Sequence, residues 1–415
     1  MTSLSAPRTW KSRLARRIAG IATLLAFVFA PHRPAAQVSQ TQAFLLHSFA
    51  DSPDGANPFQ SPVFRDNAGN LYGTTLQGST DTNGTIFKIS SDGAETVLYR
   101  FSPDANGRAP SPMTGVIGDD AGNLYGTETF GGSQGYGTIF KLDATGKLTI
   151  LYAFTAGSDG RSPYGGLVRD ANGNLYGTAA AAGNLQGCGN GCGTVFKLDT
   201  SSKFTVLYTF SGGDDGGIPH SNLVLDSAGN LYGTTVGDGA YDQGTVFTVS
   251  TTGQERVLYS FSATGEFDGA EPVAGLTRDS AGNLYGTTYF GGGGTCFDGY
   301  NPGCGTVFRL DKSGAFTVLH SFAGGDDGGW STAALVLNVD GNLYGTASGA
   351  GQFGAGTLFK ISKAGTFSLL HSFTGGKDGA RPMAGMIADA TGTLYGTTAG
   401  GTTFGFGAVF KLVPK

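Results

Sequence analysis

The sequence predicts an all-β fold: a seven-bladed β-propeller of four-stranded antiparallel blades. Three observations support this prediction. One repeat occurs seven times, each copy contains four short strand patterns joined by glycine-bearing turns, and the chain begins and ends at different points of the repeat. The chain of 415 residues contains 72 Gly, 29 Phe and 16 Tyr, and its hydrophobic content of 39% is ample for a core.

The first 36 residues differ in character from all that follow. A basic segment containing Arg8 and Arg17 precedes an apolar run from Ile18 to Ala30, and the small residues Ala35 and Ala36 come soon after. This order is typical of a secretory signal peptide, although an uncleaved N-terminal membrane anchor is the alternative. We therefore expect export, with residues 37–415 forming a single propeller domain.

The charge of the exported part narrows the classes of partner. Without residues 1–36 the chain has 20 basic and 31 acidic residues, so its formal charge is −11. Nucleic acids and anionic membranes require a cationic surface, so we expect neither as a partner. No later segment has the length of a membrane span and no anchor precedes Lys415, which favours a secreted or cell-surface monomer. No motif indicates a cofactor.

Three motifs define the repeat. The first, Asn-Leu-Tyr-Gly-Thr, has its tyrosine at Tyr72, Tyr125, Tyr176, Tyr232, Tyr285, Tyr344 and Tyr395. The second, Gly-(Thr/Ala)-(Val/Ile/Leu)-Phe, begins at Gly84, Gly137, Gly193, Gly244, Gly305, Gly356 and Gly407. The third, of the type Val-Leu-Tyr-x-Phe, ends at Phe49, Phe101, Phe154, Phe210, Phe261, Phe322 and Phe373. Seven copies of each motif predict seven equivalent structural units.

Each copy is expected to form four strands, A to D. In the third copy these are residues 166–168, 174–178, 194–198 and 205–210. Strands A and B are joined by an Asp-x-x-Gly turn, in which the Asp can accept backbone N–H groups and the Gly can take a positive φ. The sixth of these turns begins with Asn338 where the other copies have Asp, and we expect the asparagine to play the same part.

The ends of the chain indicate how the units are assembled. A four-stranded sheet of ~50 residues cannot cover both of its faces alone, whereas a closed ring buries them against one another. The exported part starts with a D-type strand at residues 44–49 and ends with a C-type strand at residues 409–412. We therefore expect the N-terminal strand to complete the last blade.

The repeat resembles a known family. The pattern Gly-Asn-Leu-Tyr-Gly-Thr-Thr followed by Gly-Thr-Val-Phe-Lys-Leu is similar to the bacterial extracellular Gloeobacter/Verrucomicrobia (GloVer) repeat over residues 44–412. The resemblance implies an exported, propeller-like protein. It supplies no activity and no catalytic residues.

Variation between the copies indicates which end of the propeller binds a partner. The B–C loops differ in length and content, whereas the A–B and C–D turns are short and uniform, so we expect binding at the B–C/D–A end. Aromatic residues recur there and could stack on sugar rings or anchor a protein, although filling gaps between loops is the alternative. The expected binding residues are Phe130, Tyr241, Phe290, Tyr300, Phe353, Phe404 and Trp330, the last at a place where most copies have Pro.

The four cysteines occur as local pairs in two B–C loops. In an exported protein the pairs Cys188/Cys192 and Cys296/Cys304 predict two disulfides; a zinc site is the alternative, but it lacks further ligands. An Asp-Gly step, or Asn-Gly in one copy, also recurs in each D–A loop. Its presence in every copy favours a role in the turn over a ring of cation ligands. We expect no metal site.

No residue pattern identifies a catalytic centre. His47, His320 and His371 occupy the tyrosine position of strand D and are interpreted as structural, and the isolated loop residue His220 is interpreted as incidental. Basic residues of strand C are expected to pair with the turn aspartates. They are Lys88, Lys141, Lys197, Arg309, Lys360 and Lys411.

Three functions follow from these features. The first is a binding module for an extracellular glycan or protein that uses the B–C/D–A face. The second is a polysaccharide lyase or hydrolase with acidic residues near the channel mouth, and the third is a structural protein of the cell envelope. Residues that break the repeat are few, chiefly Glu128, His220, Glu266, Glu271 and Trp330. We therefore rank the binding module first and an enzyme below it.

Overall fold

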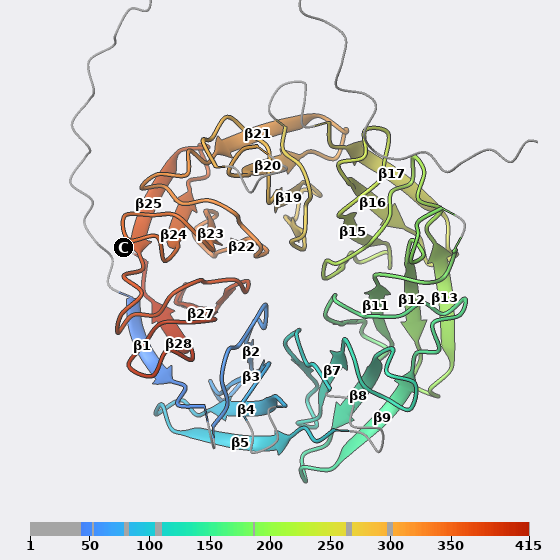
Figure 1. Cartoon of the computed structure of the whole chain (residues 1–415), viewed down its shortest axis with the longest axis horizontal. Coiled ribbons are helices and arrows are strands. Elements are labelled where there is room, and N and C mark those ends of the chain that lie inside the picture. The colour runs from blue at the N-terminus through green and yellow to red at the C-terminus, as the bar shows by residue number, and fades with distance from the viewer. Residues whose placement is uncertain are drawn as a thin grey trace, which may run out of the picture. The chain divides into compact units, whose positions relative to one another are not determined.

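A computed structural model describes residues 43–51, 54–78, 83–103, 110–185, 187–262, 268–296 and 302–414. These residues form seven four-stranded antiparallel sheets, which stand side by side in a ring (Figure 1). The prediction of a seven-bladed propeller is confirmed. Within these ranges no helix is long and apolar enough to cross a membrane. The expected signal peptide, residues 1–36, lies outside the described residues.

The strands of each blade run from the centre of the ring outward in the order A, B, C, D (Figure 1). Blades 1 to 7 have as strand A β2 (Phe64–Arg65), β6 (Ile117–Gly118), β10 (Val168–Arg169), β14 (Val224–Leu225), β18 (Thr277–Arg278), β22 (Val336–Leu337) and β26 (Ile387–Ala388). Their B strands are β3 (Leu71–Thr75), β7 (Leu124–Glu128), β11 (Leu175–Ala179), β15 (Leu231–Thr235), β19 (Leu284–Thr287), β23 (Leu343–Ala347) and β27 (Leu394–Thr398). Their C strands are β4 (Thr85–Ile89), β8 (Thr138–Leu142), β12 (Thr194–Leu198), β16 (Thr245–Val249), β20 (Thr306–Leu310), β24 (Thr357–Ile361) and β28 (Ala408–Leu412). Their D strands are β5 (Glu95–Arg100), β9 (Leu148–Ala153), β13 (Phe204–Thr209), β17 (Glu255–Ser260), β21 (Phe316–Ser321), β25 (Phe367–Ser372) and, in blade 7, β1 (Ala43–Ser48).

The first strand of the chain completes the last blade. Strand β1 pairs antiparallel with β28, with Ala43 opposite Leu412 and Ser48 opposite Ala408. The closure expected from the two ends of the sequence is therefore present, and it places the N-terminal strand on the outer edge of blade 7.

The hydrophobic core lies between blades. Each of the seven core clusters in the described part of the chain joins strands B and C of one blade to residues of the blade before it. The cluster between blades 7 and 1, for example, contains Phe49 and Val409 together with Leu71 and Phe87. The Phe49 ring meets the Phe87 ring edge-on at 5.1 Å between centroids. A blade is therefore stable only against its neighbours, as circular stacking requires.

The glycine of the Asn-Leu-Tyr-Gly-Thr motif makes room for this core. In blade 3, Gly177 of strand B stands opposite Phe196 of strand C. A Cβ at Gly177 would lie 2.6 Å from Cζ of Phe196, closer than carbon atoms can approach. Two of the repeat motifs are thus one packing unit: the glycine of the first accommodates the phenylalanine of the second.

The asparagine and the tyrosine of the Asn-Leu-Tyr-Gly-Thr motif bind the aspartate of the A–B turn. Oδ1 of Asp170 accepts hydrogen bonds from the backbone N–H groups of Asn172 and Asn174, at 3.0 and 2.8 Å. Oδ2 accepts from Nδ2 of Asn174 at 2.7 Å and from the hydroxyl of Tyr176 at 3.0 Å. Burial raises the pKa of Asp170, but these hydrogen bonds outweigh it and leave the pKa below its ordinary value. The turn therefore contains a fully bonded carboxylate.

Blade 6 uses a different residue for this purpose. Asn338 stands at the usual aspartate position, but the hydroxyl of Tyr344 donates to Asp340, two residues later, at 2.7 Å. The Nδ2 group of Asn338 instead donates to the carbonyl of Gly392 in blade 7, at 2.9 Å. The expectation that Asn338 replaces the aspartate is therefore wrong, because the carboxylate has moved along the turn and the amide links two blades.

Among the described residues, no basic side chain of strand C lies within ion-pair distance of a turn aspartate, so the expected ion pairs are not formed. The ammonium groups of Lys88, Lys141 and Lys197 lie over the rings of Tyr72, Tyr125 and Tyr176, at 5.9, 5.9 and 5.7 Å from the ring centroids. In each case the lysine and the tyrosine are directly opposite in the B–C pairing. The lysine thus covers an aromatic face that is buried or half-buried, where cation–π attraction contributes ~0.5–1 kcal/mol.

Candidate functional site

The B–C and D–A loops meet at one end of the ring and are joined by short backbone bridges. Arg161 of a D–A loop pairs with Ala181 of the next B–C loop, and Gly217 pairs with Gly237 in the same way one blade later. Equivalent bridges occur in blades 1, 5, 6 and 7. We call this end the loop face. Among the described residues, backbone hydrogen bonds join its neighbouring loops to one another.

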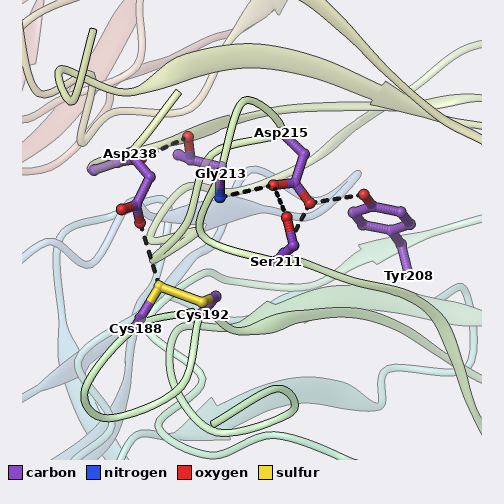
Figure 2. The surroundings of a disulfide bond; sticks show 9 residues. Cys188, Cys192, Tyr208, Ser211, Gly213, Asp215 and Asp238 are labelled. Atoms are coloured by element: carbon purple, nitrogen blue, oxygen red, sulfur yellow. Dashed lines mark hydrogen bonds between the residues drawn. A yellow bond between two sulfur atoms is a disulfide. The ribbon is translucent and has the colours of Figure 1, made fainter. Parts of the chain in front are cut away.

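A disulfide between Cys188 and Cys192 shapes the B–C loop of blade 3 (Figure 2). The predicted pairing is present, with the two Cα atoms 5.2 Å apart. Sγ of Cys188 lies 3.3 Å from Oδ2 of Asp238, which belongs to the B–C loop of blade 4. Burial, together with the negative charges of Asp242 and Asp215, raises the pKa of Asp238. The bridge therefore packs against an acidic side chain of the neighbouring blade.

The second predicted disulfide, Cys296–Cys304, belongs to the core cluster between blades 5 and 6, and Trp330 packs against that cluster. The indole ring is half-buried and covers Gly349. Trp330 has φ 55°, and its N–H donates to the carbonyl of Cys304 at 2.9 Å. Ile218 has the same geometry relative to Cys192, one residue before a proline. Trp330 therefore aligns with the residue before the proline, not with the proline itself as expected from sequence.

The Asp-Gly steps of the D–A loops serve the turn. Oδ2 of Asp159 accepts the hydroxyl of Tyr152 at 3.0 Å and the N–H of Thr155 at 2.8 Å. His320 replaces the tyrosine in blade 5 and places Nε2 3.0 Å from Oδ2 of Asp327. His47 and His371 make the same contact with Asp54 and Asp378. The interpretation of these histidines as structural substitutes agrees with this geometry. Within the described ranges, no group of three or more potential metal ligands is found.

Apart from the half-buried Trp330, the expected aromatic binding residues divide into three groups. Tyr241, Phe353 and Phe404 are 59%, 52% and 55% exposed, and Phe130 is 43% exposed. Phe290 is only 5% exposed because its ring is packed inside the loop region, so the expectation that it faces solvent is wrong. Tyr300 lies outside the described residues.

A pocket of about 240 Å³ opens in the centre of the ring. It is lined by segments that precede strand A in all seven blades, which places it in the channel, and we call it the channel pocket. Its polar side chains include Gln60, Tyr164, His220, Asn222 and Thr332. No Asp, Glu, Lys or Arg of the described residues lines it. No motif in the sequence predicted this pocket.

Two loops that are distant in sequence bring aromatic rings together at the pocket. Tyr164 and His220 have ring centroids 4.5 Å apart, and Tyr164 also meets Phe130 edge-on at 6.4 Å. Burial lowers the pKa of His220 to about 4, so the imidazole is neutral at pH 7. An aromatic strip thus runs from the exposed Phe130 into the channel pocket. The interpretation of His220 as incidental missed this contact.

The loop face is acidic around this neutral pocket. Acidic residues outnumber basic ones by twelve to three in its described loops. The acidic residues are Asp51, Asp54, Asp159, Asp214, Asp215, Asp238, Asp242, Asp268, Glu271, Asp326, Asp327 and Asp378, and the basic ones are Arg161, Lys377 and Arg381. The potential of this face therefore disfavours anions.

A family model of the Gloeobacter/Verrucomicrobia repeat matches residues 35–190, 184–297 and 293–415. The chain belongs to the Gloeobacter/Verrucomicrobia repeat family. The three matches together span the whole propeller, so the resemblance inferred from the three motifs is confirmed. No curated protein matches this member of the family.

Solved structures similar to this Gloeobacter/Verrucomicrobia repeat protein share its fold at low identity. The extracellular domain of a putative one component system from B. thetaiotaomicron has a TM-score of 0.54 and 12% identity over 91% of this chain. The match spans only 40% of that chain. A chain of the mitotic checkpoint complex has a TM-score of 0.57 and 13% identity, covering 95% of this chain and 99% of that one. A putative 6-phosphogluconolactonase from Bacteroides uniformis has a TM-score of 0.51 and 16% identity, covering 79% and 88%. These likenesses concern the fold alone.

Proposed function

We propose that this protein is an extracellular binding module that holds a glycan on its loop face. The observation that carries the proposal is the exposure of Tyr241, Phe353 and Phe404, each more than half accessible, on loops that are held together by backbone bridges. Exposed rings on an ordered surface offer flat apolar faces without a large ordering cost on binding. Sugar rings present apolar C–H faces of matching shape.

Two disulfides and an N-terminal segment of signal-peptide type support an extracellular location, because disulfides persist in oxidising compartments. Two carboxylates in the same loop as Tyr241, those of Asp238 and Asp242, add acceptors for sugar hydroxyl groups. The loop face thus combines the two kinds of group that bind carbohydrates: aromatic faces and hydrogen-bond acceptors.

The experiment is a glycan array on the chain without residues 1–36, followed by titration calorimetry with each glycan that binds. The variants Tyr241→Ala, Phe353→Ala and Phe404→Ala are measured singly and together. Loss of a ring that contacts the ligand is expected to cost about 2 kcal/mol, or roughly 30-fold in affinity.

Phe44→Ala is the matched control, because Phe44 is 45% exposed but belongs to the outer strand β1, away from the loops. Its affinity is expected to equal that of the unaltered chain. Glycan binding that the triple variant retains in full, or binding to proteins with no glycan bound, would contradict the proposal.

A further inference from the structure

One position that faces the channel differs from copy to copy, although the motif residues of the blades repeat. Six residues before the first residue of each A–B turn the chain has Gln60, Met113, Tyr164, His220, Val273, Thr332 and Met383. Six of these seven residues line the channel pocket. A position with the same structural role in every blade would carry the same residue type, as the motif glycine and phenylalanine do. This position therefore contributes something other than blade packing.

We propose that the channel pocket binds one uncharged sugar unit, the terminal unit of a glycan chain, against Tyr164, His220 and Asn222. The inference rests on the proposed function and deepens it, because it assigns a second, central site on the loop face and a chemical class of ligand.

The size of the pocket limits what it accommodates. Its volume of about 240 Å³ is below the ~300–1,000 Å³ of sites that enclose a drug-sized molecule. A single sugar ring is of that smaller size, whereas an internal segment of a polysaccharide is not. Because the pocket lies in the channel, with blades on all sides, a chain enters it only by its end.

The lining is suited to a neutral polyhydroxylated ring. Tyr164 and His220, with ring centroids 4.5 Å apart, supply aromatic surface on one side. Oδ1 of Asn222 accepts the N–H of Gly166 at 2.6 Å, which fixes the amide. Within the described residues its Nδ2 group has no acceptor, so it is available to a ligand oxygen. The hydroxyl of Thr332 donates to the carbonyl of Met383 at 2.9 Å, and its oxygen can accept in turn.

Asn222 is itself a departure from the repeat. Four residues before the A–B turn the other copies have Pro62, Gly115, Gly166, Gly275, Ala334 and Gly385, all with small or non-hydrogen-bonding side chains. The other six blades are built without a carboxamide at this position. It places a donor beside the aromatic pair, where a sugar hydroxyl could accept.

Charge determines the class of sugar. No formally charged side chain of the described residues lines the pocket, and the surrounding loops carry twelve acidic and three basic residues. A uronate, sulfate or phosphate group would enter without a cationic partner and against the field of the loop face. Neutral hexoses and N-acetylhexosamines meet neither penalty.

The test uses methyl glycosides of neutral hexoses and N-acetylhexosamines, each hexose paired with its uronate, and measures binding by saturation-transfer NMR and calorimetry. At least one neutral glycoside is expected to bind, and its uronate partner at least tenfold more weakly. Tyr164→Ala and His220→Gln are each expected to lower the affinity for the neutral glycoside at least tenfold.

Control variants distinguish binding in the channel pocket from binding to the exposed rings of the loop face, and from loss of the fold. Phe44→Ala is expected to leave the affinity for the glycoside unchanged. The triple variant of Tyr241, Phe353 and Phe404 should lose more affinity for oligosaccharides than for the methyl glycoside. Thermal unfolding checks that each variant folds. If Tyr164→Ala fails to fold, His220→Gln, whose side chain is polar and of similar size, carries the test.

The outcomes are distinguishable. Equal binding of uronates, or binding that neither Tyr164→Ala nor His220→Gln weakens, overturns the inference but leaves the proposed function intact. The inference is also overturned, and the proposed function left intact, if oligosaccharides bind only through Tyr241, Phe353 and Phe404 and no methyl glycoside binds. If no saccharide of any length binds, both proposals fail together.

Discussion

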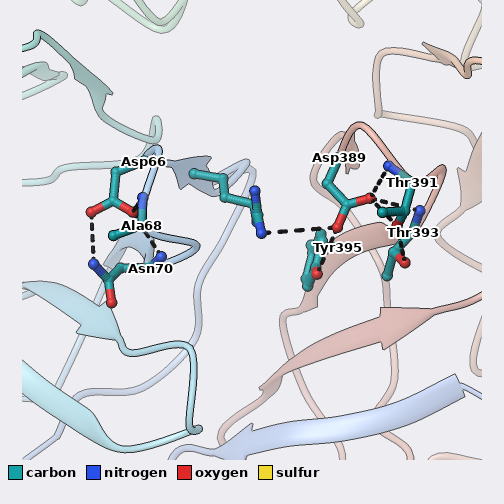
Figure 3. A network of polar contacts seen from close by, with 8 residues as sticks. Asp66, Ala68, Asn70, Asp389, Thr391, Thr393 and Tyr395 are labelled. Carbon is teal, nitrogen blue, oxygen red and sulfur yellow. Dashed lines mark hydrogen bonds and ion pairs between the residues drawn. The ribbon is translucent and has the colours of Figure 1, made fainter.

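The guanidinium group of Arg65 lies 3.9 Å from the carboxylate of Asp389, and the two residues belong to the first and the last blade (Figure 3). The same guanidinium is 5.6 Å from the centroid of the Tyr395 ring. Arg278 lies over Tyr232 at 5.6 Å in the junction between blades 4 and 5. The junction that closes the ring thus uses a contact that also occurs in its interior.

Because the closing junction and the interior junctions of the ring use equivalent contacts, removing a core ring from either should lower the free energy of unfolding equally. Phe49 of the closing junction and Phe154 of an interior one are 0% and 1% exposed, and each meets a phenylalanine of the next blade edge-on. Phe49→Ala and Phe154→Ala are each expected to lower the free energy of unfolding by about 3–5 kcal/mol. Denaturant titration measures both. A much smaller cost for Phe49→Ala would mean that the closing junction is weak.

The glycine of strand B is predicted to tolerate no side chain. Gly177→Ala would place a Cβ 2.6 Å from the Phe196 ring, and displacing that ring should cost about 1–3 kcal/mol. Gly189→Ala is the control, because Gly189 has no heavy atom within 4 Å of its Cβ position. Thermal unfolding should show a lower midpoint for the first variant alone. Equal midpoints would refute the packing role given to this motif.

The disulfides are predicted to order loops while the ring remains folded without them. Each closes a loop of four or eight residues along the chain, so chain entropy gives about 2 kcal/mol for each. The double variant Cys188→Ala/Cys192→Ala should therefore retain the β-sheet circular dichroism spectrum, with faster hydrogen exchange in residues 180–193. Global unfolding on reduction would show that the bridges maintain the fold.

Glu128 is predicted to make stability depend on pH. Burial raises its pKa to about 7, and its carboxyl accepts a hydrogen bond from Thr138 at 2.6 Å. The folded state thus holds a proton that the unfolded state releases above its ordinary pKa near 4.5. The stabilisation from this proton is complete below about pH 4.5 and is lost as the pH rises through 7.

Glu128→Gln removes this titration and retains an acceptor for Thr138. The variant should be more stable than the unaltered chain at pH 8 and about equally stable at pH 5. Denaturant midpoints at the two pH values provide the measurement. Glu95→Gln gives a comparison, since burial and the charge of Asp54 raise the pKa of Glu95 to about 7 as well. A Glu128→Gln variant with no gain at pH 8 would contradict the assignment.

Local sequence patterns were sufficient to predict the strands of the scaffold, because the residues of each motif belong to a single blade. Strand C of blade 3 falls at the predicted residues 194–198, and the disulfides join cysteines four and eight residues apart. Burial of individual rings was less predictable. Phe290 and Tyr241 occur in comparable loops, yet one is 5% and the other 59% exposed, a difference that the local sequence does not specify.

The amino-acid sequence by itself determined the seven blades, their strands, the closure by the first strand and the disulfide pairs, since periodicity and turn chemistry act over tens of residues. Only the tertiary structure decided that Tyr164 and His220, 56 residues apart, meet in the channel. The ring carries equivalent positions of successive blades to one centre, and nothing in the sequence near either residue marks the other as its neighbour.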